Sequence, residues 1–265
     1  MKMPFSRMGL IFLISVLALS VSACGSGEKG SDGGEVPEKI TIGTDTSFVP
    51  FEFLNQDTGE YEGFDIDLVK AIAEKIGIEY ELKPMDFNGL IPALQTGNLD
   101  MAIAGMTITD ERKKVVDFTR PYYDAGLYIL VRSDEKSIKG VEDLKGKVVA
   151  TKQGTTSFNY ASKLDGLKEV RPFPNIDQAY MELEKGSADA VIYDSPNVLY
   201  YIKTKGKGKV KAVGDLLQAE SYGIAFPKGS PLRDKVDEAL GELMEDGTYE
   251  KLYVKWFGQK PPKKE

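Results

Sequence analysis

Histidine is absent from the 265-residue chain, and this absence excludes several kinds of chemistry. Histidine is the commonest general base near neutral pH and a usual zinc ligand, so histidine-based metal sites and Ser-His or Cys-His nucleophile pairs are excluded. Positive charge is in deficit too, because 34 basic and 41 acidic residues give a net charge of −7. A general nucleic-acid partner therefore has no electrostatic support. We expect no cofactor, no metal site and no nucleic-acid partner.

Cysteine occurs once, at Cys24, directly after an apolar segment. Lys2 and Arg7 precede a mostly apolar run at residues 8–21, which is the build of a secretory signal and too short to assign as a membrane span. The run VSAC resembles a bacterial lipobox, which implies cleavage before Cys24 and attachment of lipid to its sulfur. The alternative is a plain signal peptide, cut at an A-x-A-like site, with an incidental cysteine.

We predict a lipoprotein-type signal peptide at residues 1–23, and a lipidated Cys24 with a flexible tether at residues 24–37. The tether is rich in Gly and Ser and cannot bury apolar surface. No later apolar run is long enough to cross a bilayer. The protein would be secreted across the cytoplasmic membrane and held on its outer face by lipid, with palmitate as an expected acyl group, since a diacylated cysteine anchors firmly.

Strand and helix patterns alternate after the tether. Short apolar runs that end in turn residues predict strands at 39–45, 100–105, 147–154, 169–174 and 188–194. Apolar spacings and capping residues predict helices at 64–77, 91–97, 155–166 and 175–186, and a last helix at 230–247. This rhythm predicts an α/β fold whose mostly parallel sheets are covered by helices on both faces.

Two segments share one plan: GNLDMAIAGMTIT at 97–109 and GSADAVIYDSPNV at 186–198. Each reads Gly-x-x-Asp, then an apolar strand, then a polar turn. Each would therefore end a strand at a crevice, where open α/β sheets bind ligands. Extended stretches at 122–134 and 216–229 suggest two lobes joined by two crossings. The chain has no solenoid repeat, no G-x-G-x-x-G turn and no P-loop.

The run AGMTITDERKK places Arg112 in the first turn of a predicted helix. That end of a helix is partially positive, so it disfavours a cation and favours an anion. One interpretation is a surface arginine paired with Asp110 or Glu111. The other is an arginine that grips a ligand anion together with the helix end. Spacing alone leaves both open.

Several runs closely resemble the polar amino-acid-binding proteins of bacterial ABC importers (solute-binding protein family 3), in particular its glutamine-binding members. They are GTDTSFVPFEF, GFDIDLVKAIAEKIG, TITDERK, YGIAFPKG and GTYEKLYVKWFG. The resemblance covers about 38–258 and implies a two-lobed type II periplasmic-binding-protein fold, each lobe a mostly parallel sheet flanked by helices. It implies a discontinuous lobe 1 at 38–121 plus 223–265 and a continuous lobe 2 at 127–217. Two hinge strands, at 122–126 and 218–222, would join the lobes.

The resemblance implies binding without catalysis: the lobes close on a free amino acid, which is then delivered to the membrane subunits of an ABC permease. Arg112 would grip the α-carboxylate, with backbone N–H groups near Thr155 and Thr156. The carbonyl of Gly105 and the carboxylate of Asp194 would meet the α-ammonium. Thr107 would serve both ends of the ligand backbone. Taken singly, these residues are equally typical of turns and helix caps.

At the other end of the ligand, Phe48 and Phe87 would sandwich the aliphatic stem, although FVPFEF offers Phe51 and Phe53 as rivals. Asp45 and Lys152 would face the tip of the side chain. A terminal amide suits both, because its NH₂ donates to Asp45 and its oxygen accepts from Lys152. Glutamate would bring an anion to Asp45, arginine or lysine would bring a cation to Lys152, and asparagine would be too short. We therefore predict glutamine.

Two positions depart from the pattern of glutamine-binding members: Tyr193 replaces a histidine, and Thr156 replaces a glycine. Both would line the pocket, so another polar or basic amino acid stays open as the ligand. A dehydratase-type enzyme of the same fold is a further alternative, and it would need a free acid or base in the cleft. A receptor's sensing domain would need a membrane span after the body, or a separate signalling partner.

Overall fold

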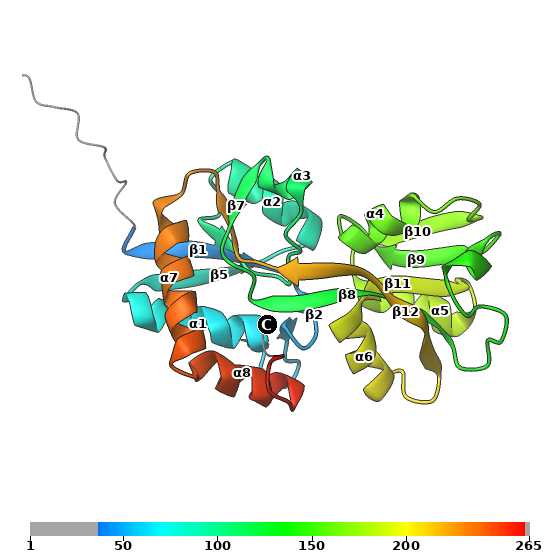
Figure 1. The fold of residues 1–265 in the computed structure, drawn as a ribbon. Coiled ribbons are helices and arrows are strands. Elements are labelled where there is room, and N and C mark those ends of the chain that lie inside the picture. Colours follow the sequence, from blue (N-terminus) through cyan, green and yellow to red (C-terminus); the bar gives the residue numbers. More distant parts are fainter. Residues whose placement is uncertain (1–36, 263–265) are drawn as a thin grey trace, which may run out of the picture. The chain divides into compact units, whose positions relative to one another are not determined.

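The computed structural model describes residues 37–262, and Figure 1 shows how their helices and strands are arranged. The predicted signal peptide, the lipidation site Cys24 and nearly all of the tether lie outside the described residues. Within the described part, no helix combines the length and the apolar character needed to cross a bilayer.

The first sheet has the strand order β5-β1-β6-β13-β7. Strand β1 (Lys39–Thr44) runs parallel to β5 (Glu79–Pro84) and to β6 (Met101–Ala102). Strand β13 (Ala225–Pro227) is antiparallel to β6 and to β7 (Val116–Phe118). This sheet therefore combines the first part of the described chain with a strand from near its end.

The second sheet repeats this plan in the order β10-β9-β11-β8-β12. Strand β9 (Val148–Lys152) runs parallel to β10 (Glu169–Phe173) and to β11 (Ala190–Asp194). Strand β8 (Tyr123–Arg132) is antiparallel to β11 and to β12 (Val210–Tyr222). Each sheet thus has the predicted parallel core, extended by antiparallel strands that make it mixed.

Helices flank both sheets, so the predicted α/β class is confirmed (Figure 1). The helices are α1 (Phe64–Ile76), α2 (Phe87–Gln95), α3 (Asp110–Lys113), α4 (Thr156–Ser162), α5 (Ile176–Lys185), α6 (Ser195–Lys203), α7 (Pro231–Glu245) and α8 (Thr248–Phe257), with a 3₁₀ turn at Val141–Leu144. A small antiparallel sheet joins β2 (Ser47–Phe48), β3 (Glu52–Leu54) and β4 (Tyr61–Glu62).

Two helix predictions need correction. The helix predicted at 91–97 begins earlier, at Phe87, and includes Pro92. The helix predicted at 230–247 forms as α7 but is not the last one, because α8 follows after Gly247, which has a left-handed φ of 82°. Aromatic residues four apart hold α8 in place: Tyr253 and Phe257 lie 5.9 and 5.2 Å, centroid to centroid, from the ring of Phe64 on α1.

The chain passes between the two sheets twice, at the start of β8 and at the end of β12. There the two strands pair with Ala125 opposite Glu220 and Tyr123 opposite Tyr222. The predicted hinge segments 122–126 and 218–222 fall on this stretch of ladder. Their role as a hinge stays a prediction.

Candidate ligand-binding site

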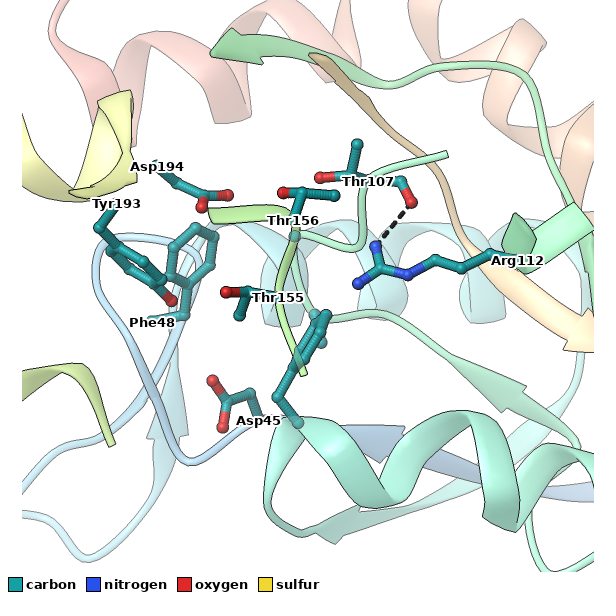
Figure 2. Close-up of a pocket in the computed structure, with 11 residues that line it drawn as sticks. Asp45, Phe48, Thr107, Arg112, Thr155, Thr156, Tyr193 and Asp194 are labelled. Atoms are coloured by element: carbon teal, nitrogen blue, oxygen red, sulfur yellow. Dashed lines mark hydrogen bonds between the residues drawn. The ribbon is translucent and has the colours of Figure 1, made fainter. Parts of the chain in front are cut away.

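One pocket collects residues from both sheets (Figure 2). It is lined by nine of the ten predicted ligand-binding residues and by two others: Asp45, Phe48, Phe87, Gly105, Thr107, Arg112, Thr155, Thr156 and Asp194, with Ala104 and Tyr193. The tenth predicted residue, Lys152, is buried beside the pocket and forms an ion pair with Asp45. The fold therefore brings the whole predicted set together.

Strand ends explain this convergence. Asp45 follows β1 and Gly105 lies just beyond β6, while Lys152 ends β9 and Asp194 ends β11. Because neighbouring parallel strands present their carboxyl ends at the same edge, each sheet gathers its polar groups there. The two edges meet across the pocket, as the Lys152–Asp45 pair between the sheets demonstrates.

Arg112 turns into the pocket rather than toward the surface. Its side chain is buried; Nη1 donates to the carbonyl of Thr107 at 2.7 Å, the dashed contact in Figure 2, and Nη2 donates to the carbonyl of Gly154 at 3.1 Å. The carboxylate Oδ1 of Asp110, the alternative partner, instead lies 3.8 Å from Nζ of Lys113. Burial lowers the pKa of Arg112, an effect opposed first by the carboxylate of Asp194. The surface-pair interpretation is therefore wrong.

The positive end of helix α3 can attract a ligand anion only weakly. Helix α3 has only four residues, so few peptide dipoles align behind the pocket. Thr109 caps this single turn by accepting the N–H of Arg112 at 3.1 Å. The short turn thus serves to aim the arginine, and the positive character of this corner comes from the guanidinium.

Gly105 is more than a turn glycine. Its φ of +53° is left-handed, and a Cβ added there would overlap the ring of Phe48. Its N–H donates to Asp65 Oδ2 at 2.9 Å, and the hydroxyl of Tyr122 donates to the same oxygen at 2.8 Å. Burial raises the pKa of Asp65 to about 6, although these two hydrogen bonds oppose the rise.

Asp194 faces the pocket with one oxygen unengaged. Its Oδ2 accepts from the hydroxyl of Tyr222 at 2.6 Å, whereas Oδ1 has no hydrogen-bond partner among the described residues. Asp194 precedes α6 but makes no side-chain cap, so the helix-cap interpretation fails. Burial, followed by the carboxylate of Glu220, raises the pKa of Asp194 to about 7, while Tyr222 and Arg112 lower it.

Hydrogen-bond donors at the Thr155–Thr156 corner come from the start of helix α4. Thr155 caps α4: its hydroxyl accepts the N–H of Phe158 at 3.2 Å and donates to the carbonyl of Lys152 at 2.7 Å. Thr156 begins α4 and lines the pocket. With the Thr155 hydroxyl occupied, this corner can offer an anion the backbone N–H groups at the start of α4 and the hydroxyl of Thr156.

Tyr193 lines the pocket, as predicted, with its ring edge-on to Phe48, 5.8 Å between centroids. Two other residues near the pocket, Asp65 and Glu220, were missed by the site prediction. Asp65 gave a readable signal, because it shares the buried face of α1 with Leu68, Val69 and Ile72. Glu220, buried on β12, gave none.

Comparison with known proteins identifies the architecture. Residues 40–259 match the family described as bacterial extracellular solute-binding proteins, family 3. This chain belongs to that family. The family places the protein among extracellular solute-binding proteins and confirms the predicted type II periplasmic-binding-protein fold, with two lobes joined by two strands.

Known relatives and a solved structure match most of the length of this chain. The ABC transporter glutamine-binding protein GlnH of Bacillus subtilis (strain 168) is 39% identical and spans 98% of this chain and 99% of its own length. The arginine-binding extracellular protein ArtP of the same strain is 36% identical over 94% of this chain and 96% of its own length. A solved ancestral arginine-binding protein bound to glutamine is 48% identical, with a TM-score of 0.81 over 85% of this chain and 100% of its own.

Proposed function

We propose that this family member is the substrate-binding component of an ABC importer that captures a free L-amino acid, with glutamine as the preferred ligand, and delivers it to a membrane permease. The observation that carries the proposal is the pairing of a buried guanidinium with a buried carboxylate in one pocket. Arg112 on α3 and Asp194 at the end of β11 are 9% and 5% exposed. Relatives named for glutamine and arginine binding support an amino acid as the ligand class.

The zwitterion fits the polarity of this end of the pocket. An α-carboxylate beside Arg112 gains a charge-assisted hydrogen bond and meets the backbone N–H groups at the start of α4. An α-ammonium beside Asp194 gives the unengaged Oδ1 a donor. The carbonyl of Gly105 and the hydroxyl of Thr107 complete the set. These roles were predicted from the resemblance, and the geometry supports them.

The far end of the pocket favours a neutral polar side chain. Lys152 and Asp45 neutralise each other there, each about 1% exposed. A terminal amide can add a donor to Asp45 and an acceptor to Lys152 without leaving a charge uncompensated. A charged side chain would bring an excess charge into a dry site. Arginine is the second candidate, because the ancestral arginine-binding protein with glutamine bound is similar over its whole length.

Capture by hinge closure fits this division of the site. Lobe 1 (38–121 plus 223–265) would hold the ligand first, and lobe 2 (127–217) would close over it about segments 122–126 and 218–222. Contacts between the lobes, such as Arg112 to Gly154, exist only when the lobes meet and would favour closure. Lipid on Cys24 would keep the protein on the outer face of the membrane, beside its permease.

Calorimetric titration of the full chain with each of the twenty L-amino acids tests the proposal. We expect glutamine to bind best, at about micromolar Kd, and acidic amino acids to bind at least about a hundredfold more weakly. Recovery of the unchanged amino acid after long incubation separates binding from dehydratase-type catalysis. If no amino acid binds, the proposal is overturned. A preference for arginine would overturn only the choice of glutamine as the preferred ligand.

A further inference from the structure

The buried carboxylate of Glu220 lies within the proposed hinge segment 218–222, and the binding scheme above gives its side chain no role toward the ligand. Glu220 is 6% exposed and sits on β12, opposite Ala125 in the strand ladder. It is not among the residues that line the pocket. Burying a carboxylate is unfavourable unless its oxygens are satisfied, so its partners indicate what it does.

Both oxygens of Glu220 accept hydrogen bonds. Oε2 accepts from the hydroxyl of Thr107 at 3.0 Å, and Oε1 accepts from the side-chain amide of Gln218 at 2.9 Å. Gln218 is the one non-glycine residue of the described chain with a positive φ, at 40°. A carboxylate has no hydrogen to give, so the direction of the Thr107 bond is fixed.

The backbone holds Thr107 against this strand. The N–H of Ile108 donates to the carbonyl of Ser221 at 2.8 Å, and the N–H of Gly223 donates to the carbonyl of Met106 at 3.0 Å. Thr107 itself forms a bridge with Tyr222. The separation between the Thr107 hydroxyl and Glu220 is therefore set by main chain on both sides.

A threonine hydroxyl has a single hydrogen, and here that hydrogen points at Glu220. Only oxygen lone pairs remain for the pocket that Thr107 lines. We infer that Glu220 is a positioning residue that makes the Thr107 hydroxyl an obligate acceptor, so that the pocket selects a ligand with a hydrogen-bond donor, the α-ammonium, at this point. The inference deepens the proposed function and rests on it.

The charge of Glu220 acts in the same direction. Its carboxylate adds to burial in raising the pKa of Asp194, so the two acidic groups share one corner of the site. A cationic group placed there gains from both of them. The hydrogen bond and the charge can be separated, because glutamine at position 220 still offers an oxygen to Thr107, whereas methionine offers none.

Calorimetry on the full chain tests the inference, using whichever of L-glutamine and L-arginine binds the unaltered protein more tightly. We expect Glu220→Met to weaken binding about tenfold or more, as Thr107→Val does, and Glu220→Gln to stay within about threefold. Combining Glu220→Met with Thr107→Val should cost no more than either alone. Asp215→Asn, which removes an exposed carboxylate from the same strand outside segments 122–126 and 218–222, is the matched control and should change affinity less than about twofold.

Equal losses for Glu220→Gln and Glu220→Met would overturn the inference, because charge alone would then explain the effect. So would an additive loss in the double variant, or unchanged binding by Glu220→Met. Should Glu220→Met fail to fold, Glu220→Gln is measured with and without Thr107→Val: no effect in the Thr107→Val background supports the inference, and an equal loss in both overturns it. Absence of binding of all twenty amino acids by the unaltered protein overturns the proposed function itself.

Discussion

The two five-stranded sheets share a structural device that locks their parallel cores. In the first sheet, Asp100 donates its N–H to the carbonyl of Thr41 at 2.9 Å and accepts the N–H of Thr41 on Oδ2 at 2.8 Å. In the second, Asp189 makes the same two bonds to Val148, at the same two distances. The aspartate of the shared Gly-x-x-Asp pattern therefore fixes the register of β6 and β11 against the neighbouring parallel strand, just before each strand begins.

Their difference lies eight residues after the shared glycine. There the first sheet has Gly105, which offers backbone, and the second has Asp194, which offers a charge. Each half also brings one cation: Arg112 comes from α3, just before β7 of the first sheet, and Lys152 ends β9 of the second, beside the pocket. Equivalent scaffolds thus carry different chemistry, and opposite charges face each other across the pocket at both of its ends.

The largest expected effect comes from removing the cation of lobe 1. Arg112→Ala should weaken amino-acid binding by about a hundredfold or more, because a bound α-carboxylate would be buried without its partner. Calorimetry measures the loss, and Lys113→Ala, an exposed neighbour, serves as the control. A tenfold loss or less would contradict the role assigned to Arg112.

Breaking the other charge pair should change selectivity. Asp45→Asn leaves Lys152 uncompensated, so glutamate should gain about tenfold or more on glutamine. Lys152→Met leaves Asp45 uncompensated, so arginine should gain by a similar factor. Competition titrations measure both ratios. Parallel losses for all ligands, without a change of preference, would mean that the pair does not face the ligand side chain.

Asp194 should make binding depend on pH. Its pKa of about 7 means that it ionises as pH rises, and an α-ammonium favours the ionised form, so affinity should increase about tenfold between pH 6 and pH 8. The charged and titratable groups around it are Glu220, Arg112, Lys152, Tyr222, Tyr193 and Tyr180. Asp194→Asn should weaken binding and flatten the profile, and an unchanged slope would assign the effect elsewhere.

The raised pKa of Asp194 has the opposite effect on stability: the free energy of unfolding should fall, not rise, as pH increases. Because burial raises the pKa of Asp194 above its ordinary value, the folded state holds its proton more tightly than the unfolded chain does. Its contribution to the free energy of unfolding is therefore fully present below about pH 4 and is lost as pH rises to about 7. Asp65, with a pKa of about 6, behaves likewise.

The smallest expected effect concerns Glu52, which is buried at the start of β3 and is not among the residues that line the pocket. Burial, followed by the charge of Asp65, raises its pKa well above the usual range, and neither of its oxygens has a hydrogen-bond partner among the described residues. A protonated Glu52 can donate to the unengaged Oδ1 of Asp65, and so can an amide. Glu52→Gln should therefore change the free energy of unfolding by less than about 1 kcal/mol at pH 5.

At pH 8 the same variant should be more stable than the unaltered chain, because it has no buried carboxyl to ionise. The sign follows from the raised pKa: stability from the protonated form is present at low pH and lost as pH rises. Urea unfolding at both pH values measures the change, with the exposed Glu79→Gln as the control. A loss of stability at pH 8 would show that Glu52 is needed as a carboxylate.

Most helices and strands could be predicted from the chain itself, because their signals are local. Gly77 ends α1 in the left-handed conformation that its position predicts, and the apolar spacing of α5 appears directly in its buried face. Helix α8 was missed although its aromatic residues recur every four positions, at Tyr249, Tyr253 and Phe257, which is a helical spacing. What the sequence does not show is where α8 packs, because its contacts with Phe64 on α1 join residues far apart in the chain.

The sequence determined the residue types at the pocket, because matched runs around Arg112, Gly105 and Asp194 specify local turns and strand ends. Tertiary structure decided which polar groups contact each other: Asp45 and Lys152 are 107 positions apart, and Thr107 and Glu220 are 113 apart. The physical reason is the distance along the chain over which each kind of interaction acts. Hydrogen-bonded turns and apolar periodicity act within a few residues, whereas burial, and with it the pKa of Asp194 or the direction of a hydroxyl, depends on what the fold brings alongside.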